Sequence, residues 1–264
     1  MKNSKQTIYQ VDAFSNKVFG GNPAAVCILE RWLDEASMQS IAAENNLAET
    51  AFIVKRKSDF EIRWFTPTLE VALCGHATLA SAHVLFEHLK YENNTIEFYS
   101  SQSGHLSVTK NNDLLTLDFP KDELKKVDPP LDILKAFKKA PLETYKGKTD
   151  YLLLYENQHD IEQSDPNLHI LKHNKARGIM ITAPGIEVDF VSRFFAPGSG
   201  VDEDPVTGSA HTSLTPFWAE RLGKTKLKAQ QLSKRKGELI CELSGDRVKI
   251  SGNAITYLIG EIYF

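Results

Sequence analysis

The chain has 264 residues, of which 42% are apolar and 25% are charged, and its formal net charge at pH 7 is −3. This composition is typical of a soluble globular protein with one large core or two smaller ones. The one lysine-rich run, near residues 121–148, reads as a solvated surface and not as a nucleic-acid site. No secretion signal or membrane-length apolar segment is recognisable, and the cysteines are few and widely spaced. We therefore expect a cytoplasmic protein with neither a nucleic-acid nor a membrane partner.

The first half of the chain predicts a strand-rich domain with two different helices. Short apolar or alternating segments read as strands: 7–14, 24–29, 50–55, 60–65 and 95–100. Segment 33–45 (LDEASMQSIAAEN) predicts a surface helix that turns Met38, Ile41 and Ala42 inward and opens at an N-cap signature. The residues after Cys74 (GHATLASA) have no polar face, which is typical of a helix buried inside a curled sheet.

The second half continues with the same kinds of element. Segments that read as strands are 151–156, 178–183, 188–195, 238–243 and 247–251. The segment 164–167 (SDPN) predicts another helix start. We expect residues 128–150, rich in proline and lysine, to connect two domains, and the last segment, 254–264, to be a strand that completes the first domain's sheet.

The two halves repeat each other. In chain order, the segments that align are 60–67 (FEIRWFTP) with 190–197 (FVSRFFAP), 74–78 (CGHAT) with 207–211 (TGSAH), and 105–119 with 238–252. Both members of the last pair read as hairpins. We therefore expect an α+β fold of two pseudo-symmetric, strand-rich barrel domains, each wrapped around one central helix. The expected bounds are 1–120, completed by 254–264, and 121–253.

Each repeat places a glycine at the start of its central helix. A helix N-terminus presents unpaired backbone N–H groups and the positive end of the helix dipole. Gly75 and Gly208 lack the Cβ that would keep a ligand away from these groups. Two such helix starts, facing one cleft between the domains, would attract a small anion such as a carboxylate.

The side chains beside these glycines differ between the repeats. Cys74 aligns with Thr207, and His76 aligns with Ser209. Two cysteines here would suggest a two-base racemase, but Thr207 leaves Cys74 without a thiol partner. The residues alone leave open that Cys74 is a small apolar side chain and that the hydroxyls and His76 only bond the helix start.

Carboxylates lie close to both helix starts in the sequence. Glu49 stands at the entry of an apolar strand, Glu70 precedes the first helix start, and Asp204 precedes the second. An apolar cleft would make one such carboxylate a stronger base, competent for general acid–base catalysis.

Other kinds of site are not supported by the sequence. His83 and His88 lack metalloprotease spacing, and no Cys-x-x-Cys pair, phosphate loop, dinucleotide fingerprint or serine-hydrolase elbow is present. We therefore expect no metal and no cofactor.

The motifs together resemble one known family. Segments 11–14 (VDAF) with 19–26 (FGGNPAAV), 46–50 (NLAET), 74–78 (CGHAT) and 204–210 (DPVTGSA) are similar to the signatures of the PhzF-like (phenazine biosynthesis-like) isomerases. That family is a branch of the diaminopimelate epimerase fold. The resemblance covers nearly the whole chain.

The resemblance implies a function and a set of site residues. It implies a homodimer that moves a proton without a cofactor, as in the isomerisation of trans-2,3-dihydro-3-hydroxyanthranilate. Glu49 matches the family's acid/base carboxylate, and the residues that match its assistants are His76, Asp204 and Ser209. The expected substrate-binding positions are Gly75, Ala77, Thr207, Gly208 and Cys74. Thr207 departs from the related epimerases, which carry cysteine at both helix starts.

The sequence thus predicts an isomerase that acts on a small anionic amino- or hydroxy-carboxylate, with Glu49 as general acid/base. Two alternatives stay open at this point. One is an epimerase or racemase that uses Cys74 and Glu49 as its two bases. The other is a metabolite-binding protein that kept the cleft without turnover.

Overall fold

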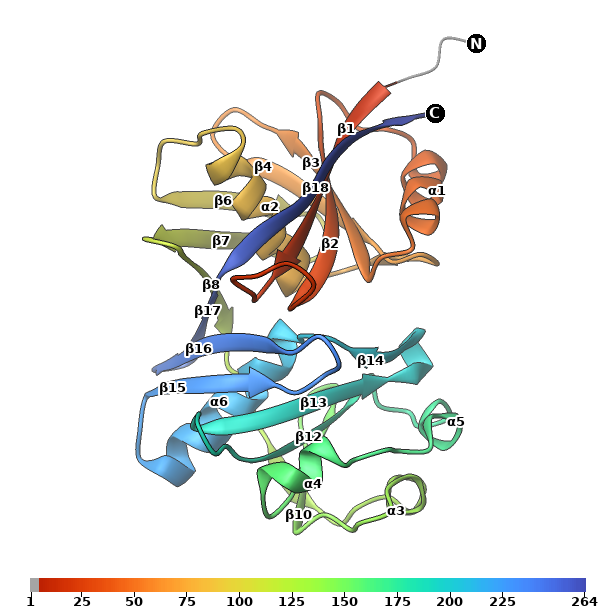
Figure 1. The fold of residues 1–264 in the computed structure, drawn as a ribbon, viewed down its shortest axis with the longest axis vertical. Coiled ribbons are helices and arrows are strands. Elements are labelled where there is room, and N and C mark those ends of the chain that lie inside the picture. The colour runs from red at the N-terminus through yellow and green to blue at the C-terminus, as the bar shows by residue number, and fades with distance from the viewer. Residues whose placement is uncertain (1–4) are drawn as a thin grey trace. The chain divides into compact units, whose positions relative to one another are not determined.

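The computed structural model describes residues 5–264, and these form two compact units (Figure 1). Unit 1 contains the described residues up to Asp118 together with Ser251–Phe264, and unit 2 contains Phe119–Ile250. The chain therefore passes from one unit to the other twice.

Unit 1 is a curled sheet with two helices. Its elements are β1 (Lys5–Ala13), β2 (Asn22–Leu29), α1 (Glu35–Asn45), β3 (Glu49–Lys55), β4 (Phe60–Phe65), β5 (Glu70–Val71), α2 (Gly75–Glu87), β6 (Thr95–Ser100), β7 (Gly104–Asn111), β8 (Leu114–Pro120) and β18 (Ala254–Tyr263). The strands pair in the order β18-β1-β2-β3-β4-β6-β7-β8, and β5 pairs with β4. The pairs β2–β3 and β4–β6 are parallel, and the others are antiparallel.

Unit 2 has the same kinds of element. They are β9 (Lys125–Val127), α3 (Leu131–Ala136), β10 (Glu143–Lys146), β11 (Tyr151–Leu154), α4 (Gln158–Glu162), α5 (Leu168–Leu171), β12 (Ile179–Pro184), β13 (Phe190–Ala196), a 3-10 turn (Pro197–Ser199), β14 (Val201–Asp204), α6 (Gly208–Leu222), β15 (Lys226–Gln231), β16 (Gly237–Ser244) and β17 (Arg247–Gly252). Its strands pair in the order β9-β10-β11-β12-β13-β15-β16, with β11–β12 and β13–β15 parallel.

The internal repeat predicted from the sequence is visible in this pairing. Each strand of unit 2 has a counterpart in unit 1 with the same neighbours and the same parallel or antiparallel sense. The short strand β9, which follows the first passage between the units, takes the place in unit 2 that β18 takes in unit 1. The predicted fold class, strand-rich α+β with one central helix in each half, is confirmed, and so is the predicted role of the last strand beside β1.

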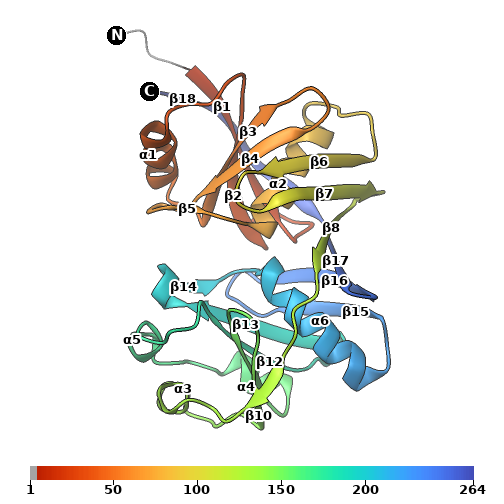
Figure 2. The ribbon, with the colours of Figure 1, turned by 180° about the vertical axis from the view of Figure 1, so that it is seen from behind.

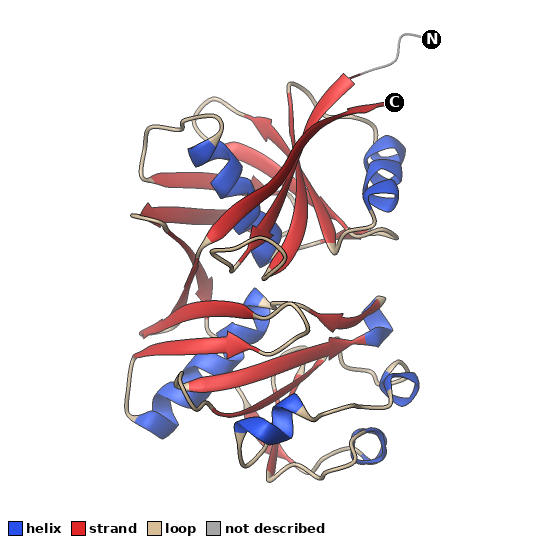
Figure 3. Cartoon of the chain, viewed as in Figure 1, coloured by secondary structure: helices blue, strands red, loops and turns tan. Residues whose placement is uncertain are grey.

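Helix α2 lies inside the curled sheet of unit 1, and Figures 1 and 2 show strands on both sides of it. Most of its side chains are buried, and many are small. Its buried hydroxyls are satisfied within the helix, because Thr78 Oγ1 donates to the Cys74 carbonyl (2.6 Å) and Ser81 Oγ donates to the Ala77 carbonyl (2.7 Å). A helix with many small side chains and a few hydroxyl groups can therefore fill the barrel without leaving these hydroxyls unpaired. Figure 3 shows α6 along the strands of unit 2 in the same way.

Helix α1 brings Glu49 to its place. Asp34 caps the helix by accepting from the Ser37 N–H (2.9 Å), and Met38, Ile41 and Ala42 are buried as predicted. Asn46 ends the helix in the left-handed region (φ 47°), and β3 begins three residues later.

The same ion pair precedes the central helix in both units. Arg63 on β4 donates two hydrogen bonds to Glu70 (2.8 and 2.6 Å), and Arg193 on β13 donates two to Glu203 (2.7 and 2.9 Å). Bidentate pairs of this kind fix direction as well as distance. They hold β5 and β14 in place just before the two helix starts.

The prediction that residues 128–150 connect the two domains is wrong. This stretch lies within unit 2 and contains α3 and β10. Its apolar residues Ile133, Ala136 and Phe137 are buried in that unit's core. The exposed Lys135, Lys138 and Lys139 beside them hid this short amphipathic pattern. In the described part of the chain, no helix is both long and apolar enough to cross a membrane.

The buried α2 gives a stability prediction. Leu79 is fully buried on this helix, so we expect Leu79→Ala to lower the free energy of unfolding by about 2–5 kcal/mol. The control is Leu89→Ala, because Leu89 is 49% exposed. Urea denaturation followed by circular dichroism measures both changes. Equal losses in the two variants would contradict the placement of α2 in the core.

Candidate active site

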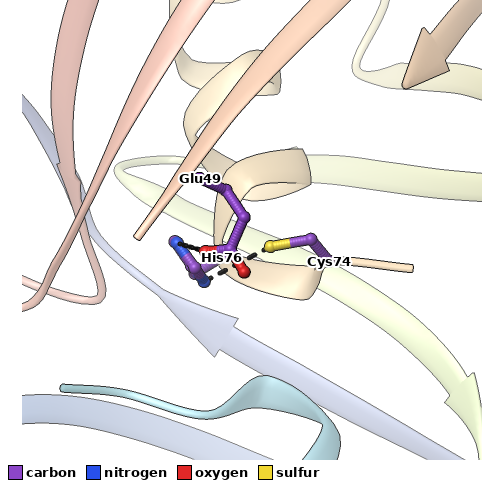
Figure 4. Close-up of side chains that lie close together, drawn as sticks. All are labelled: Glu49, Cys74 and His76. Atoms are coloured by element: carbon purple, nitrogen blue, oxygen red, sulfur yellow. Dashed lines mark hydrogen bonds and ion pairs between the residues drawn. The ribbon is translucent and has the colours of Figure 1, made fainter. Parts of the chain in front are cut away.

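Three side chains meet at the start of α2 in unit 1 (Figure 4). Glu49 Oε2 lies 3.1 Å from His76 Nε2, and Cys74 Sγ lies 3.5 Å from His76 Nδ1. The imidazole therefore stands between the carboxylate and the thiol, with one ring nitrogen toward each.

Local structure explains why these residues meet. Cys74 is the N-cap residue of α2, and His76 is in its first turn. Glu49 is the first residue of β3, which pairs with β2 so that Ala24 lies opposite Glu49. The first residue of β3 thus places its carboxylate beside the start of α2.

A fourth residue completes this group. Asn22, the first residue of β2, is fully buried, and its Nδ2 lies 3.2 Å from His76 Nδ1. The sequence analysis did not single out Asn22 as a site residue. The only signal was its place in the family-like segment 19–26.

The surroundings keep the thiol protonated. Cys74 and His76 are 6% and 4% exposed, and the side chain of Glu49 is 15% exposed. Burial, followed by the nearby Glu49 carboxylate, raises the pKa of Cys74 to about 11. Burial opposes protonation of His76, but Cys74 and Glu49 outweigh it and raise the pKa of that ring. His76 therefore favours its protonated form, whereas Cys74 remains a thiol at neutral pH.

Glu49, Cys74 and His76 are also residue types that bind metal ions, and their potential ligand atoms lie within 4.8 Å of one another. These atoms do not converge on one point, because the carboxylate lies at one nitrogen of the ring and the thiol lies at the other (Figure 4). A single ion would bind only one of those nitrogens. The arrangement is an ion pair at one ring nitrogen and a thiol contact at the other, which suits a metal centre less well.

The corresponding helix start in unit 2 carries hydroxyls. Thr207 is the N-cap residue of α6, and Gly208 is its first residue, as Cys74 and Gly75 are for α2. Thr207 Oγ1 donates to Asp204 Oδ2 (2.6 Å), and the Thr207 N–H donates to Gln231 Oε1 (2.9 Å). Asp204 is therefore held in place beside the helix start.

Ser209 is held by residues that the sequence analysis missed. Arg177 Nη1 donates to Ser209 Oγ (3.0 Å), while the rest of its guanidinium forms a two-point ion pair with the buried Asp150. Because Arg177 fills an acceptor position of Ser209, the serine O–H is left to donate elsewhere. Arg177 belongs to none of the sequence motifs, and only the folded structure brings it next to α6.

The predicted site residues thus fall into two groups. Glu49, Cys74 and His76 come together in unit 1, where Gly75 and the buried Ala77 share the same helical turn. In unit 2, the predicted residues that come together at the start of α6 are Asp204, Thr207, Gly208 and Ser209. Glu70 faces Arg63 and belongs to neither group.

Comparisons with known proteins identify the family. Residues 11–260 match the family model described as phenazine biosynthesis-like protein. An uncharacterized isomerase of Pseudomonas aeruginosa is 49% identical over 257 residues, covering 97% of this chain and 98% of that protein. A PhzF-family crystal structure from Enterococcus faecalis has 44% identity and a TM-score of 0.96, covering 99% of this chain and 100% of that one.

A more distant likeness concerns the fold alone. A hydroxyproline epimerase from Agrobacterium vitis is 10% identical, with a TM-score of 0.66 over 98% of this chain and 93% of that one. This agrees with the epimerase-like fold expected from the motifs. With the family model spanning nearly its whole length, this chain belongs to the phenazine biosynthesis-like (PhzF) family of isomerases.

Proposed function

We propose that this protein is a cofactor-independent isomerase that moves a proton within a small anionic amino- or hydroxy-carboxylate, with Glu49 as general acid/base. The observation that carries the proposal is the pairing of Glu49 with His76 at 3.1 Å in a nearly solvent-free place beside a helix start. A carboxylate that only balanced charge would weaken the binding of an anion there. Its presence is explained if it handles a proton.

The reaction needs no external oxidant or reductant. Glu49 takes a proton from a substrate carbon, and the electron pair of that C–H bond moves into the adjoining unsaturated system. The same carboxyl group then returns the proton to another carbon, and the double bond shifts accordingly. His76 Nε2, at 3.1 Å from Glu49 Oε2, stabilises the negatively charged carboxylate.

The helix starts would hold the anionic group of the substrate. In this proposal the groups that bind the anionic part of the substrate are the N–H groups at Gly75 and Gly208, with the Ser209 hydroxyl and Asp204. The internal repeat supports it, since both units build a glycine helix start. A substrate similar to trans-2,3-dihydro-3-hydroxyanthranilate has the required carboxylate and unsaturation.

A two-base racemase is less well supported. Its second base would be Cys74, but this thiol has a raised pKa and contacts the same imidazole as Glu49. Bases joined through one ring share their protons and do not stand on opposite faces of a substrate carbon. Thr207, at the matching place in unit 2, offers a hydroxyl that is already bonded to Asp204.

The proposal predicts that Glu49→Gln abolishes proton transfer. Wild-type protein in deuterated buffer should incorporate deuterium at a carbon of one or more small cyclic or acyclic amino- and hydroxy-carboxylates, as measured by NMR. Glu49→Gln should lose this exchange by at least about a thousandfold, because the amide cannot take up the proton. Its ligand binding should be kept or strengthened, because a negative charge is removed.

Glu97→Gln is the matched control, since Glu97 is exposed on β6, and it should exchange like wild type. Activity retained in Glu49→Gln would rule out Glu49 as the acid/base. Binding without exchange in wild type would favour a metabolite-binding protein.

The raised pKa values of the cysteines predict how fast their thiols react. Burial raises the pKa of Cys27 and Cys241 to about 12, and burial also dominates the raised pKa of Cys74, at about 11. Near pH 7.5 each thiol is therefore ionised roughly a hundredfold or more below a free cysteine. We expect Ellman's reagent to react slowly with native protein and fast with all three cysteines in urea. A native thiol as fast as free cysteine would reopen the thiolate-base mechanism.

Replacing the thiol tests its role directly. Serine keeps an O–H group that can donate to His76 Nδ1, so Cys74→Ser should keep deuterium exchange within about tenfold of wild type. A thiol acting as a base would instead cost about a hundredfold or more. Initial exchange rates measured by NMR separate the two cases, with Cys27→Ser as the control for a buried cysteine.

A further inference from the structure

We propose that Asn22 is a positioning residue that fixes the ring of His76 so that Nε2, and not a carbon, faces Glu49. The inference rests on the proposed role of Glu49 and extends the site by a residue outside the acid/base pair. It assigns a chemical purpose to a buried amide at the start of β2.

The backbone fixes Asn22 firmly. In the register of β1 and β2, Asn22 lies opposite Ala13. The turn before it uses Gly21 at φ +62°, where a Cβ would lie 2.1 Å from the Ala13 carbonyl oxygen. Only glycine fits this turn, and the turn brings the amide of Asn22 to the imidazole.

The ring of His76 has polar neighbours that select one orientation. Asn22 Nδ2 and Cys74 Sγ both lie at Nδ1, at 3.2 and 3.5 Å, and Glu49 Oε2 lies at Nε2. A half-turn of the ring would place a carbon atom against the amide and the thiol, and another carbon against the carboxylate. Every polar contact of the ring would then be lost in a buried place, where water cannot replace it.

The amide also influences where the ring carries its hydrogen. When the Asn22 N–H donates to Nδ1, that nitrogen is an acceptor, and the hydrogen of the neutral ring resides on Nε2, facing Glu49. Within unit 1, the titratable groups that face the ring are Glu49 on β3 and Cys74 at the start of α2. Glu49 favours the protonated ring, whereas donation by Asn22 disfavours a proton on Nδ1.

Nitrogen NMR on ¹⁵N-histidine protein without substrate tests the inference. The His76 signals are assigned by their loss in His76→Gln. At a pH above the raised pKa of His76, the wild-type ring should show the neutral form with hydrogen on Nε2. Asn22→Asp, nearly identical in shape, should raise the pKa of His76 by about one unit or more, because a carboxylate then favours a proton on Nδ1. Asn22→Leu should give a mixture of the two neutral forms.

Asn45 provides matched controls. Its Nδ2 donates to Thr50 Oγ1 (3.0 Å), so Asn45→Asp and Asn45→Leu remove a similar amide bond in the same unit. Both should leave the His76 signals unchanged. With a substrate in hand, Asn22→Leu should lower kcat by about 10–100-fold and change KM little, since a misplaced base affects the chemical step.

Two results would overturn the inference. One is a His76 titration in Asn22→Asp identical to wild type, and the other is a neutral wild-type ring with its hydrogen on Nδ1. If Asn22→Leu does not fold, the isosteric Asn22→Asp still decides. The expected His76 signals together with no deuterium exchange in any compound would refute the proposed function while upholding the positioning role.

Discussion

A helix can lie inside a curled sheet only if many of its side chains are small and its polar groups form hydrogen bonds within the helix. Helix α2 meets both conditions, since several alanines lie beside Thr78 and Ser81, whose hydroxyls donate to backbone carbonyls of the preceding turn. The burial of this helix is the constraint on which the rest of unit 1 depends. It determines the position of the first turn of α2, and it excludes water from the side chains around that turn.

The low exposure of that turn sets its chemistry. In a place with little water, each charged neighbour acts more strongly on a titratable group than it would in solution. Glu49 comes from a strand, His76 from a helix and Asn22 from another strand, so separate rigid elements define the geometry. Little freedom is left to be lost when a substrate is positioned.

The two units share one framework but carry different side chains at the start of their central helices. Both units keep the glycine helix start and the arginine–glutamate pair before it. At equivalent helix positions, unit 1 has His76 and unit 2 has Ser209. Unit 1 therefore has an imidazole, a carboxylate and a thiol at its helix start, and unit 2 has hydroxyls and a carboxylate held by hydrogen bonds.

Hydrophobic periodicity and local caps determined much of this protein without any tertiary information. The alternating strands, the inward face of α1 and the glycine helix starts all depend on neighbours in the chain, so the sequence predicted them correctly. The aligned segments also predicted the repeat and the two helix starts with His76 and Ser209, and the family-like motifs pointed to Glu49 and Asp204 as further site residues.

Tertiary structure alone decided the contacts between residues far apart in the chain. The bond from Asn22 to His76 spans 54 residues and that from Arg177 to Ser209 spans 32, and no local pattern encodes either. The same holds for the stretch 128–150, whose apolar residues are too few to reveal a helix until the core of unit 2 covers them. Local physics specifies elements, whereas the partner of each buried polar group depends on how strands align.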